Sequence, residues 1–319
     1  IFPCANVHVR ICVLNPRQCQ GMRGRLGNEH AFTDPKYGNI GERFKVITDI
    51  NALIAAVFAG HAADALAIEG PRQGVPIAAV ATPTQVLENE HFNARGAFVE
   101  FAVGGQLGKM PSGFIEIDGQ RIGPRSAAPA AGRDNGLLAA IKPKQAAPVT
   151  GSAGRRPLSG IRVLDLGVIV AGAESGRILA DQGAEVIKVE NTAFSDGLRQ
   201  TSAPGVAISQ SFCQGSRNKK SFGLNLRSPE GIAIFHTLAK DADIVLSNFK
   251  PGTMESLGIG YEQLKAINPR IIAVESSALG NTGPLAKSMG YGPLVRAASG
   301  LTGLWRYPEI EGSYSDGIT

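Results

Sequence analysis

Three segments of the chain carry residue types that could do chemistry, and two of them suit a phosphorylated ligand. In the first, Asn248-Phe249-Lys250 offers an amide, an aromatic ring and a cation directly after an apolar run. Because a ring can pack on a nucleotide base and a cation can meet a phosphate, this loop predicts a nucleotide contact. The alternative is a Pro-Gly turn at 251–252 with an exposed lysine.

A basic cluster forms the second segment, with four cations within the eleven residues 217–227. These cations are Arg217, Lys219, Lys220 and Arg227. Phosphate groups are bound by Lys and Arg, and the cluster adjoins a strand-like run, which favours a phosphate contact. A solvated charged edge is the alternative.

The third segment contains Asp316, which is followed by Gly317. An Asp-Gly pair by itself predicts only a turn. The five histidines form no i,i+4 pair, and three of the four cysteines are spaced by eight and seven residues, unlike any zinc pair. We therefore expect no metal site.

A glycine-rich turn with Gly167, Gly172 and Gly176 follows the apolar run 161–166, and Glu190 ends the next apolar run. The turn imitates the dinucleotide fingerprint, in which closely spaced glycines admit a pyrophosphate. Four residues instead of one separate the first two glycines, so we favour a tight turn with close helix packing. NAD binding is the alternative.

The elements that must position these residues alternate between strand and helix over 157–319. We expect strands at 161–166, 185–189, 243–247 and 270–276, and helices that end at Gln182, Lys240 and Ile267, the second of them capped by Ser228. A repeated βαβ pattern indicates a parallel sheet.

The first part of the chain, 1–132, combines a helical pattern around 49–69 with β-branched runs at 75–80 and 98–103. This combination predicts a mixed α/β layer. Thr82-Pro83 is expected to open a short helix through Leu87, and 115–122 to form a hairpin that turns at Asp118-Gly119.

A segment rich in Ala, Pro, Gly and basic residues, 133–156, is expected to be an exposed connector. It carries four of the five net positive charges of the 319-residue chain, so the flanking parts are almost neutral and no nucleic-acid partner is expected. No apolar run is long enough to span a bilayer, so no membrane partner is expected either. With no signal peptide visible, we expect a cytoplasmic protein.

Several blocks of 157–319, taken in order, resemble the family III CoA-transferases, also called the CaiB/BaiF family. The blocks are 157–166, 179–190, 217–221, 248–252, 257–261, 268–272, 283–284, 290–291 and 298–300. This resemblance implies a Rossmann-like α/β domain that moves CoA from an acyl-CoA donor to a carboxylic acid acceptor. It also implies no permanently bound cofactor, coenzyme A being part of the substrate.

The resemblance further implies roles for individual residues. Asp316 falls where the family has an aspartate nucleophile that takes up CoA as an aspartyl-CoA thioester. CoA contacts are implied for Val170, Ala171, Leu224, Asn225, Leu226, Arg227, Asn248, Phe249 and Lys250. The family's frequent Arg after the second strand is Asn191 here, and Met289 replaces a CoA-contacting Lys near Tyr291.

The first part resembles the C-terminal portion of the same family, through 32–35, 74–80, 86–87 and 91–96. The family order is therefore inverted. We expect the tail of one transferase unit at 1–132, a linker at 133–156 and the head of a second unit at 157–319, with a circular permutant as the alternative. Because family members form interlocked dimers, a homodimer or an intrachain pseudo-dimer is expected.

Two other functions stay open. The α-methylacyl-CoA racemases, a related branch, use a His together with the Asp, and this chain has Tyr291 at that position. Tyrosine is a poor general base at neutral pH, which disfavours racemisation. The second alternative, motivated by Asn191, is a non-catalytic CoA-binding half of a tandem protein.

Overall fold

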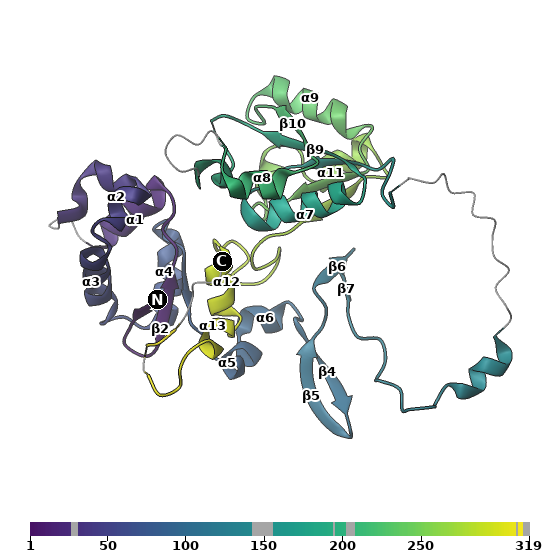
Figure 1. Ribbon diagram of the computed structural model, residues 1–319, viewed down its shortest axis with the longest axis horizontal. Coiled ribbons are helices and arrows are strands. Elements are labelled where there is room, and N and C mark those ends of the chain that lie inside the picture. Colours follow the sequence, from purple (N-terminus) through teal and green to yellow (C-terminus); the bar gives the residue numbers. More distant parts are fainter. Residues whose placement is uncertain (27–30, 142–155, 194, 202–207, 311, 315–319) are drawn as a thin grey trace. The chain divides into compact units, whose positions relative to one another are not determined.

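The computed structural model describes residues 1–26, 31–141, 156–193, 195–201, 208–310 and 312–314. The chain divides into two compact units (Figure 1). Unit 1 comprises 1–131 and 282–319, and unit 2 comprises 132–281. Residues 282–319, which the sequence grouped with 157–281, thus pack with the first part of the chain.

Unit 2 is built on a five-stranded parallel sheet. Its strands are β8 (Arg162–Asp165), β9 (Glu185–Glu190), β10 (Lys220–Gly223), β11 (Ile244–Ser247) and β12 (Ile272–Glu275). They lie in the order β10-β9-β8-β11-β12, and each neighbouring pair is parallel. The chain adds two strands on one side of β8 and then crosses to the other side. This reversal places the loops that follow β8 and β11 next to each other.

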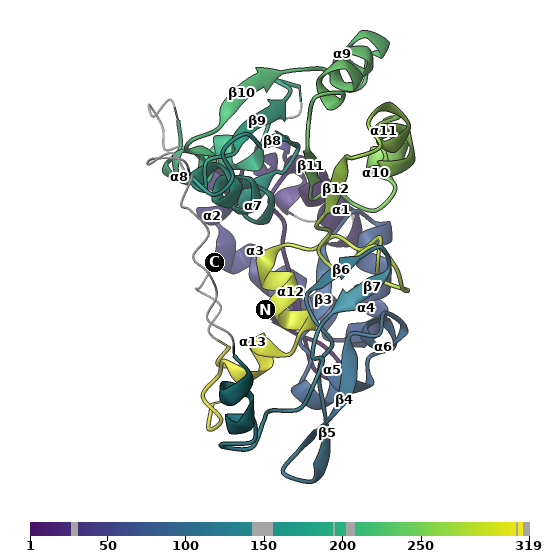
Figure 2. The ribbon, with the colours of Figure 1, turned by 90° about the vertical axis from the view of Figure 1, so that its right-hand side faces the viewer.

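Helices cover both faces of this sheet. They are α7 (Ile169–Asp181), α8 (Gln210–Ser216), α9 (Pro229–Ala239), α10 (Thr253–Ser256) and α11 (Tyr261–Ile267). Figure 2 shows α7 and α8 on one side of the strands and α9 and α11 on the other. Within β8, Val163 packs in a cluster with Ala180, and Leu164 in a cluster with Phe235. Successive strand residues point to opposite faces, which explains why β8 is apolar on both.

The elements expected in this part of the sequence are confirmed, and so is the parallel sheet. The expected strands correspond to β8, β9, β11 and β12, and the expected helices to α7, α9 and α11. At the start of α9 the Ser228 hydroxyl accepts the N–H of Gly231 at 3.0 Å, as a cap should. The strand β10 was not expected, because all four of its residues are exposed at the edge of the sheet and show no apolar pattern.

Unit 1 combines a small antiparallel sheet with a helical layer, which confirms the expected mixed α/β character. Its first elements are β1 (Phe2–Pro3), β2 (His8–Ile11), α1 (Pro16–Leu26), α2 (Ile40–Phe44), α3 (Ile47–Phe58), α4 (Ala63–Arg72) and β3 (Ile77–Ala79). The strands lie in the order β1-β2-β3. Val9 of β2, Met22 of α1, Phe58 of α3 and Leu66 of α4 share one buried core.

The helical pattern around 49–69 forms two helices, α3 and α4, whose axes are bent by 113°. Gly60 lies in the break between them, where a glycine weakens helix continuation. The bend lets Phe58 and Leu66 enter the same core. Within the described residues, no single helix is long and apolar enough to cross a membrane, and α3 with α4 passes that test only as a bent pair.

Two hairpins and two short helices follow β3. They are α5 (Pro83–Glu88), α6 (Glu90–Ala94), β4 (Phe98–Val103) with β5 (Gln106–Pro111), and β6 (Ile115–Ile117) with β7 (Gln120–Ile122). Thr82 caps α5 and exchanges hydrogen bonds with Gln85. Asp118 and Gly119 have φ angles of 50° and 77°, as a two-residue hairpin turn requires. The expected helix and hairpin are confirmed.

Residues from 282 onward complete unit 1. This segment contains α12 (Gly292–Ala298) and α13 (Leu301–Leu304). The helix α12 packs against β2 and β3, and the N–H of Ala81 donates to the carbonyl oxygen of Ala297 at 3.0 Å. Buried His91 accepts the N–H of Leu285 at its Nδ1, also at 3.0 Å. The first part of the chain and this distant segment therefore share one folded unit.

The described residues of the connector, 133–141, are exposed and contain a 3-10 helix, η3 (Asn135–Ala140), whereas 142–155 lie outside the described residues.

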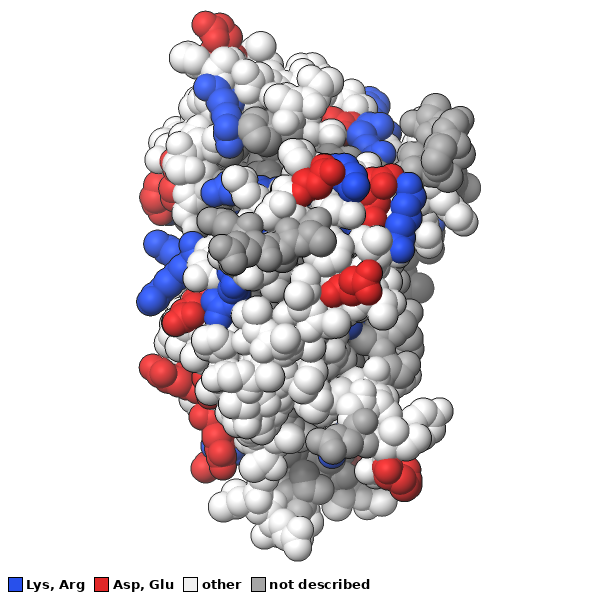
Figure 3. All heavy atoms as spheres, turned by 90° about the vertical axis from the view of Figure 1, so that its left-hand side faces the viewer, with Lys and Arg blue, Asp and Glu red and all other residues white. Residues whose placement is uncertain are grey.

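On the face in Figure 3, the coloured Lys and Arg side chains are interspersed with Asp and Glu. In the described part of the chain, no three His, Cys, Asp or Glu side chains gather as metal ligands would.

Candidate functional site

All nine residues for which a CoA contact is expected lie at one edge of the parallel sheet in unit 2. Because the strands run parallel, the loops after β8, β9, β10 and β11 all leave the sheet at its carboxyl edge. Val170 and Ala171 follow β8, 224–227 follow β10, and 248–250 follow β11. A strand spacing of about 4.8 Å separates β10 from β11 by roughly 14 Å. The edge is therefore long enough for an extended ligand.

These nine residues differ in how much of each side chain a ligand could reach. The exposed ones are Val170, Ala171, Asn225, Arg227 and Lys250. Leu224 is buried, so only its backbone could meet a ligand at this edge. Leu226 and Phe249 are half-buried and pack against the core cluster of Phe235. The aromatic ring of Phe249, which the sequence suggested as a contact for a nucleotide base, is thus partly buried against the core.

The side chain of Asn248 joins two loops at the point where the strand order reverses. Its Oδ1 accepts the N–H of Val168 at 2.8 Å, and its Nδ2 donates to the carbonyl oxygen of Val168 at 2.8 Å. A carboxamide can donate and accept at once, which suits it to this reciprocal pair. The amide that the sequence suggested for a nucleotide contact therefore holds the loop after β8 against the loop after β11.

Two carboxylates hold the neighbouring amides of the loop after β8. The N–H of Gly167 donates to Asp165 Oδ1 at 2.8 Å, and the N–H of Ile169 donates to Asp196 Oδ1 at 3.0 Å. Three consecutive amides, with that of Val168 between them, thus have protein acceptors. A pyrophosphate bound as in the dinucleotide fingerprint needs amides of this kind. The geometry favours the packing interpretation of the glycine-rich turn over NAD binding.

Gly172 and Gly176 let α7 lie directly against this loop and β8. A Cβ at Gly172 would lie 2.6 Å from the Cα of Gly167, and a Cβ at Gly176 would lie 2.2 Å from Asp165 Oδ2. Real side chains do not approach so closely, so both positions require glycine. The close helix packing expected from these glycines is confirmed.

A buried ion pair joins Asp165 to Lys219. The Lys219 Nζ lies 2.8 Å from Asp165 Oδ2, and the two side chains are 1% and 0% exposed. The same Nζ donates to the carbonyl oxygen of Ala173 in α7 at 2.8 Å. Because protein groups enclose this ammonium, the phosphate contact expected of Lys219 is wrong.

Two more cations of the basic cluster lie at the amino edge of the sheet, away from the expected CoA residues. Lys220 begins β10 and pairs with Glu185, which begins β9. Arg217 lies 2.8 Å from Asp181 at the end of α7, where Arg217 and Asn218 lower the pKa of that carboxyl to about 2. Of the four cations in the cluster, Arg227 is the one that follows the carboxyl end of a strand.

A second buried ion pair, between Lys188 and Asp196, also supports the loop after β8. Its Nζ and Oδ2 are 2.9 Å apart, and the side chains are 2% and 1% exposed. Lys188 donates to the carbonyl oxygen of Gly167 at 2.9 Å. Burial raises the pKa of Asp196, but the N–H of Leu198 and the Lys188 ammonium together lower it by more than burial raises it. The pKa of Asp196 therefore lies below its ordinary value. This carboxylate is therefore ionised at neutral pH.

A pocket of about 510 Å³ opens at the carboxyl ends of β9 and β10. It is lined by Glu190, Asn191, Thr192, Ser195, Arg199, Ser221, Gly223, Leu224 and Asn225. Arg199 donates two hydrogen bonds to Glu190, at 2.6 and 2.8 Å, which lower the pKa of that carboxyl, and it stacks on Phe212 at 3.7 Å. Because these two charges balance, the pocket offers neutral hydrogen-bonding groups, as a nucleoside would need.

The expected nucleophile, Asp316, lies outside the described residues. Tyr291, at the position of the racemase histidine, is described, and its hydroxyl accepts a hydrogen bond from Nε2 of buried Gln18 at 2.8 Å. Gln18 is itself fixed, since its Oε1 accepts the N–H of Leu14 at 2.7 Å. A neutral amide therefore positions the Tyr291 phenol.

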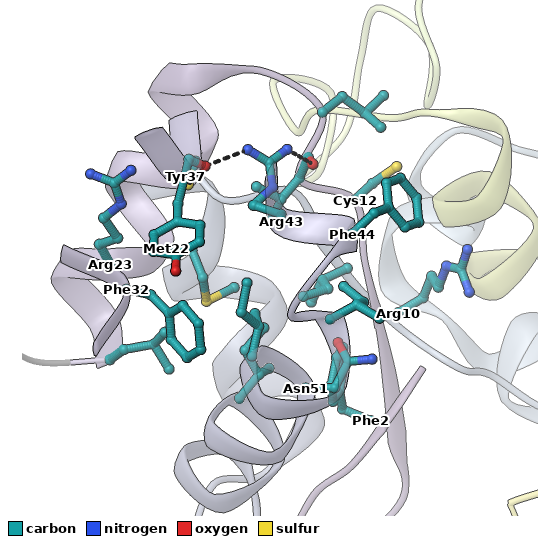
Figure 4. A pocket seen from close by; sticks show the side chains of 18 of the residues that line it. Phe2, Arg10, Cys12, Met22, Arg23, Phe32, Tyr37, Arg43, Phe44 and Asn51 are labelled. Carbon is teal, nitrogen blue, oxygen red and sulfur yellow. Dashed lines mark hydrogen bonds between the residues drawn. The ribbon is translucent and has the colours of Figure 1, made fainter. Parts of the chain in front are cut away.

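Unit 1 contains a pocket of its own, with a volume of about 340 Å³. Figure 4 shows Met22 and Phe32 in its apolar lining, and Arg43 donating to the carbonyl oxygens of Tyr37 at 2.8 Å and Val13 at 3.0 Å. None of the nine expected CoA residues lines this pocket. Most residues that line this pocket are apolar, whereas most of those that line the pocket in unit 2 have polar side chains.

Comparison with known proteins identifies the family. The model of CoA-transferase family III matches residues 1–135 and 158–314, so the chain belongs to this family. The interruption between the two matched segments coincides with the connector.

Two curated relatives and one solved structure illustrate the similarity. The probable CoA-transferase Rv1866 of Mycobacterium tuberculosis is 47% identical over 313 residues, which are 98% of this chain and 39% of that protein. The succinyl-CoA–D-citramalate CoA-transferase of Chloroflexus aurantiacus is 41% identical over 157 residues, 48% of this chain and 39% of that protein. A CAIB/BAIF family protein from Brucella suis, 33% identical, covers 50% of this chain and 43% of its own, with a TM-score of 0.46. The chain thus spans about two-fifths of the length of these relatives.

Several groups that hold the site together were not predicted from the sequence, above all Lys188, Asp196 and the pair of Glu190 with Arg199. Lys188 has a detectable signal, because it lies two residues after Val186 in β9 and therefore points to the same, buried face. Asp196 has none, since no local pattern connects it with Lys188 or with the loop after β8.

Proposed function

We propose that the protein is a CoA-transferase that moves CoA from an acyl-CoA donor to a carboxylic acid acceptor. One observation carries this proposal. Three loops with expected CoA contacts converge on the carboxyl edge of one parallel sheet, in a chain that belongs to CoA-transferase family III. Counted along unit 2, the strands lie in the order 3-2-1-4-5, the order of Rossmann-like sheets, and we include that fold in the proposal.

The proposed binding mode follows from the lining of this edge. The neutral pocket at β9 and β10 receives the nucleoside part of CoA, and the exposed cations Arg227 and Lys250 meet its phosphates. Ligands of open α/β sheets bind where the strand order reverses, which here is the junction of Asn248 with Val168. The thioester end of the ligand lies toward that junction, next to Val170 and Ala171.

The proposed reaction uses the Asp316 carboxylate as the nucleophile. It attacks the thioester carbonyl of the donor, the C–S bond breaks, and a mixed anhydride and a CoA thiolate form. The thiolate attacks the aspartyl carbonyl and gives an aspartyl-CoA thioester and the free donor acid. The acceptor carboxylate repeats the two steps in reverse order and leaves with CoA. Protons balance, because each carboxylate consumed releases another.

We also propose that the chain joins the tail of one transferase unit to the head of a second. The family model matches two segments on either side of the connector. The Rv1866 match runs through both segments, whereas the D-citramalate enzyme aligns with about half of the chain. Within unit 1, α12 packs on β2 and β3, which supports an intrachain pseudo-dimer.

Transfer of label from an acid to its CoA thioester tests the proposal. The purified protein is incubated with succinyl-CoA as donor and a panel of labelled small carboxylic acids. We expect at least one labelled acyl-CoA, and an aspartyl hydroxamate at Asp316 when hydroxylamine replaces the acceptor. Asp316→Asn should abolish both, while Asp134→Asn, in the exposed connector, should retain them.

The alternatives give different results in the same assay. Exchange of the α-proton with deuterated water in the absence of any acceptor acid would indicate a racemase. CoA binding without turnover would indicate a non-catalytic binding half. Full transfer by Asp316→Asn would contradict the proposed nucleophile.

A further inference from the structure

Ile169 adopts a backbone conformation that its side chain disfavours. Its φ angle is 56°, in the left-handed region. Asp118 and Asn218, the other described non-glycine residues with positive φ, are types that tolerate this region, whereas a β-branched residue does not. Such a conformation persists only where the surroundings impose it.

Asp196 is the side chain that holds the Ile169 amide. Its Oδ1 accepts the N–H of Ile169 at 3.0 Å and the N–H of Leu198 at 2.9 Å, which ties the loop after β8 to the loop after β9. Its Oδ2 pairs with Lys188, and Lys188 reaches back to the carbonyl oxygen of Gly167. Every one of these groups is in the protein interior or on the loop itself, so the carboxylate has a fixed position.

Ile169 is the first residue of α7. Val170 and Ala171 are the next residues, both are exposed, and their N–H groups belong to the first helical turn, which has no intrahelical acceptors. No acceptor for either N–H is found in the part of the chain that the structure describes. A change at Ile169 would re-aim both amides.

We propose that Asp196 is a positioning residue of the CoA site. It holds Ile169 in the left-handed conformation and thereby directs the amides of Val170 and Ala171 toward the bound thioester. This inference rests on the proposed function. Asp196 itself does not contact the substrate and acts through the loop that it fixes.

Two variants of Asp196 and one matched control test the proposal. Asp196→Ala removes both interactions, and Asp196→Asn keeps an oxygen that can accept from Ile169 but loses the ion pair with Lys188. Asp181→Asn, the control, removes an ion-paired carboxylate at the other end of α7. Each protein is measured for hydrogen exchange of the 167–171 amides, for the Kd of free CoA and for KM and kcat.

We expect faster hydrogen exchange at the Ile169 amide in Asp196→Ala. The Kd for free CoA and the KM for acyl-CoA should both rise about tenfold, with a smaller loss of kcat. Asp196→Asn should recover part of the affinity, and Asp181→Asn should match the wild type in all three measurements. If Asp196→Ala does not fold, the comparison of Asp196→Asn with Asp181→Asn decides.

Unchanged exchange at Ile169, or unchanged CoA affinity in a variant whose loop exchanges faster, would overturn the positioning role while leaving the proposed function intact. A wild-type protein that binds no CoA would instead contradict the proposed function and this inference with it.

Discussion

Lys219 lies buried against Asp165 with 2.8 Å between Nζ and Oδ2, although the next residue, Lys220, has a side chain that is 70% exposed. The two lysines face different environments because they stand at the start of a strand, where successive side chains point in opposite directions. One therefore belongs to the structural core of the site and the other to its solvated surface.

Lys219→Met should destabilise the protein by about 3–5 kcal/mol, because it leaves the Asp165 carboxylate buried without a counter-charge. Lys220→Met, a matched control one residue away, should change the free energy of unfolding by no more than about 0.5 kcal/mol. Urea denaturation measures both. Equal effects of the two substitutions would contradict the burial of the Lys219 ammonium.

Asn248→Ala should cost about 1–3 kcal/mol of stability, since it leaves the N–H and the carbonyl oxygen of Val168 without their partner. The control is Asn191→Ala, which removes two exposed hydrogen bonds at the same edge of the sheet, one donated to Asn225 and one accepted from the N–H of Ala193, and should stay within about 0.5 kcal/mol. Thermal unfolding compares the two variants. A stable Asn248→Ala protein would mean that the two loops do not depend on this side chain.

Gly176→Ala should destabilise the protein by at least about 2 kcal/mol, because the new methyl group would overlap Asp165 Oδ2. Gly24 provides the comparison within another helix, α1, since a Cβ there meets nothing within 4 Å. Gly24→Ala should stabilise by about 0.5–1 kcal/mol through the higher helix propensity of alanine. Opposite shifts of the unfolding midpoint are expected, and shifts of the same sign would refute the packing argument for Gly176.

The pKa of Asp181 predicts a loss of stability in acid. In the folded protein Arg217 and Asn218 lower this pKa from 3.8 to about 2, so the charged form is favoured by folding. The stabilisation is therefore complete above the unfolded-state pKa and is lost as the pH falls from about 4 through 2. Denaturation at a series of pH values should show wild type more stable than Asp181→Asn near neutrality, with the gap closing below pH 4. A gap of constant size down to pH 2 would exclude ionisation as its cause.

Much of unit 2 could be predicted because its strands and helices are encoded locally. The apolar runs of β8 and β11 and the Ser228 cap of α9 are visible in short windows of sequence. The edge strand β10 was missed for the opposite reason, since exposed residues need no apolar pattern. The break between α3 and α4 was also missed, because the shared burial of Phe58 and Leu66 is a property of the tertiary core.

The candidate site divides in the same way. Lys250 could be proposed from sequence because the loops that follow parallel strands gather at one edge of the sheet, whereas the CoA contact of Asn225 was implied only by the family resemblance. The prediction for Lys219 was wrong. Its charge suggested a phosphate contact, whereas its partner is Asp165, which lies 54 residues earlier in the sequence. Asp196 was overlooked because its role depends on contacts with two other segments, through Ile169 and Lys188. Charge in a sequence does not show whether the group will meet protein, ligand or water.

The return of the segment from 282 onward to unit 1 has a consequence for biosynthesis. All five strands of unit 2 have been translated once Glu275 is added, whereas α12, which packs on β2 and β3, ends at Ala298. We therefore expect unit 2 to finish folding on the ribosome before unit 1, although residues 1–131 of unit 1 are translated before unit 2. Proteolysis of ribosome-bound chains stalled so that 281 has just emerged should leave unit 2 protected and β2 and β3 open to cleavage. Equal protection of both units at that length would contradict this order, in which β2 and β3 wait for α12.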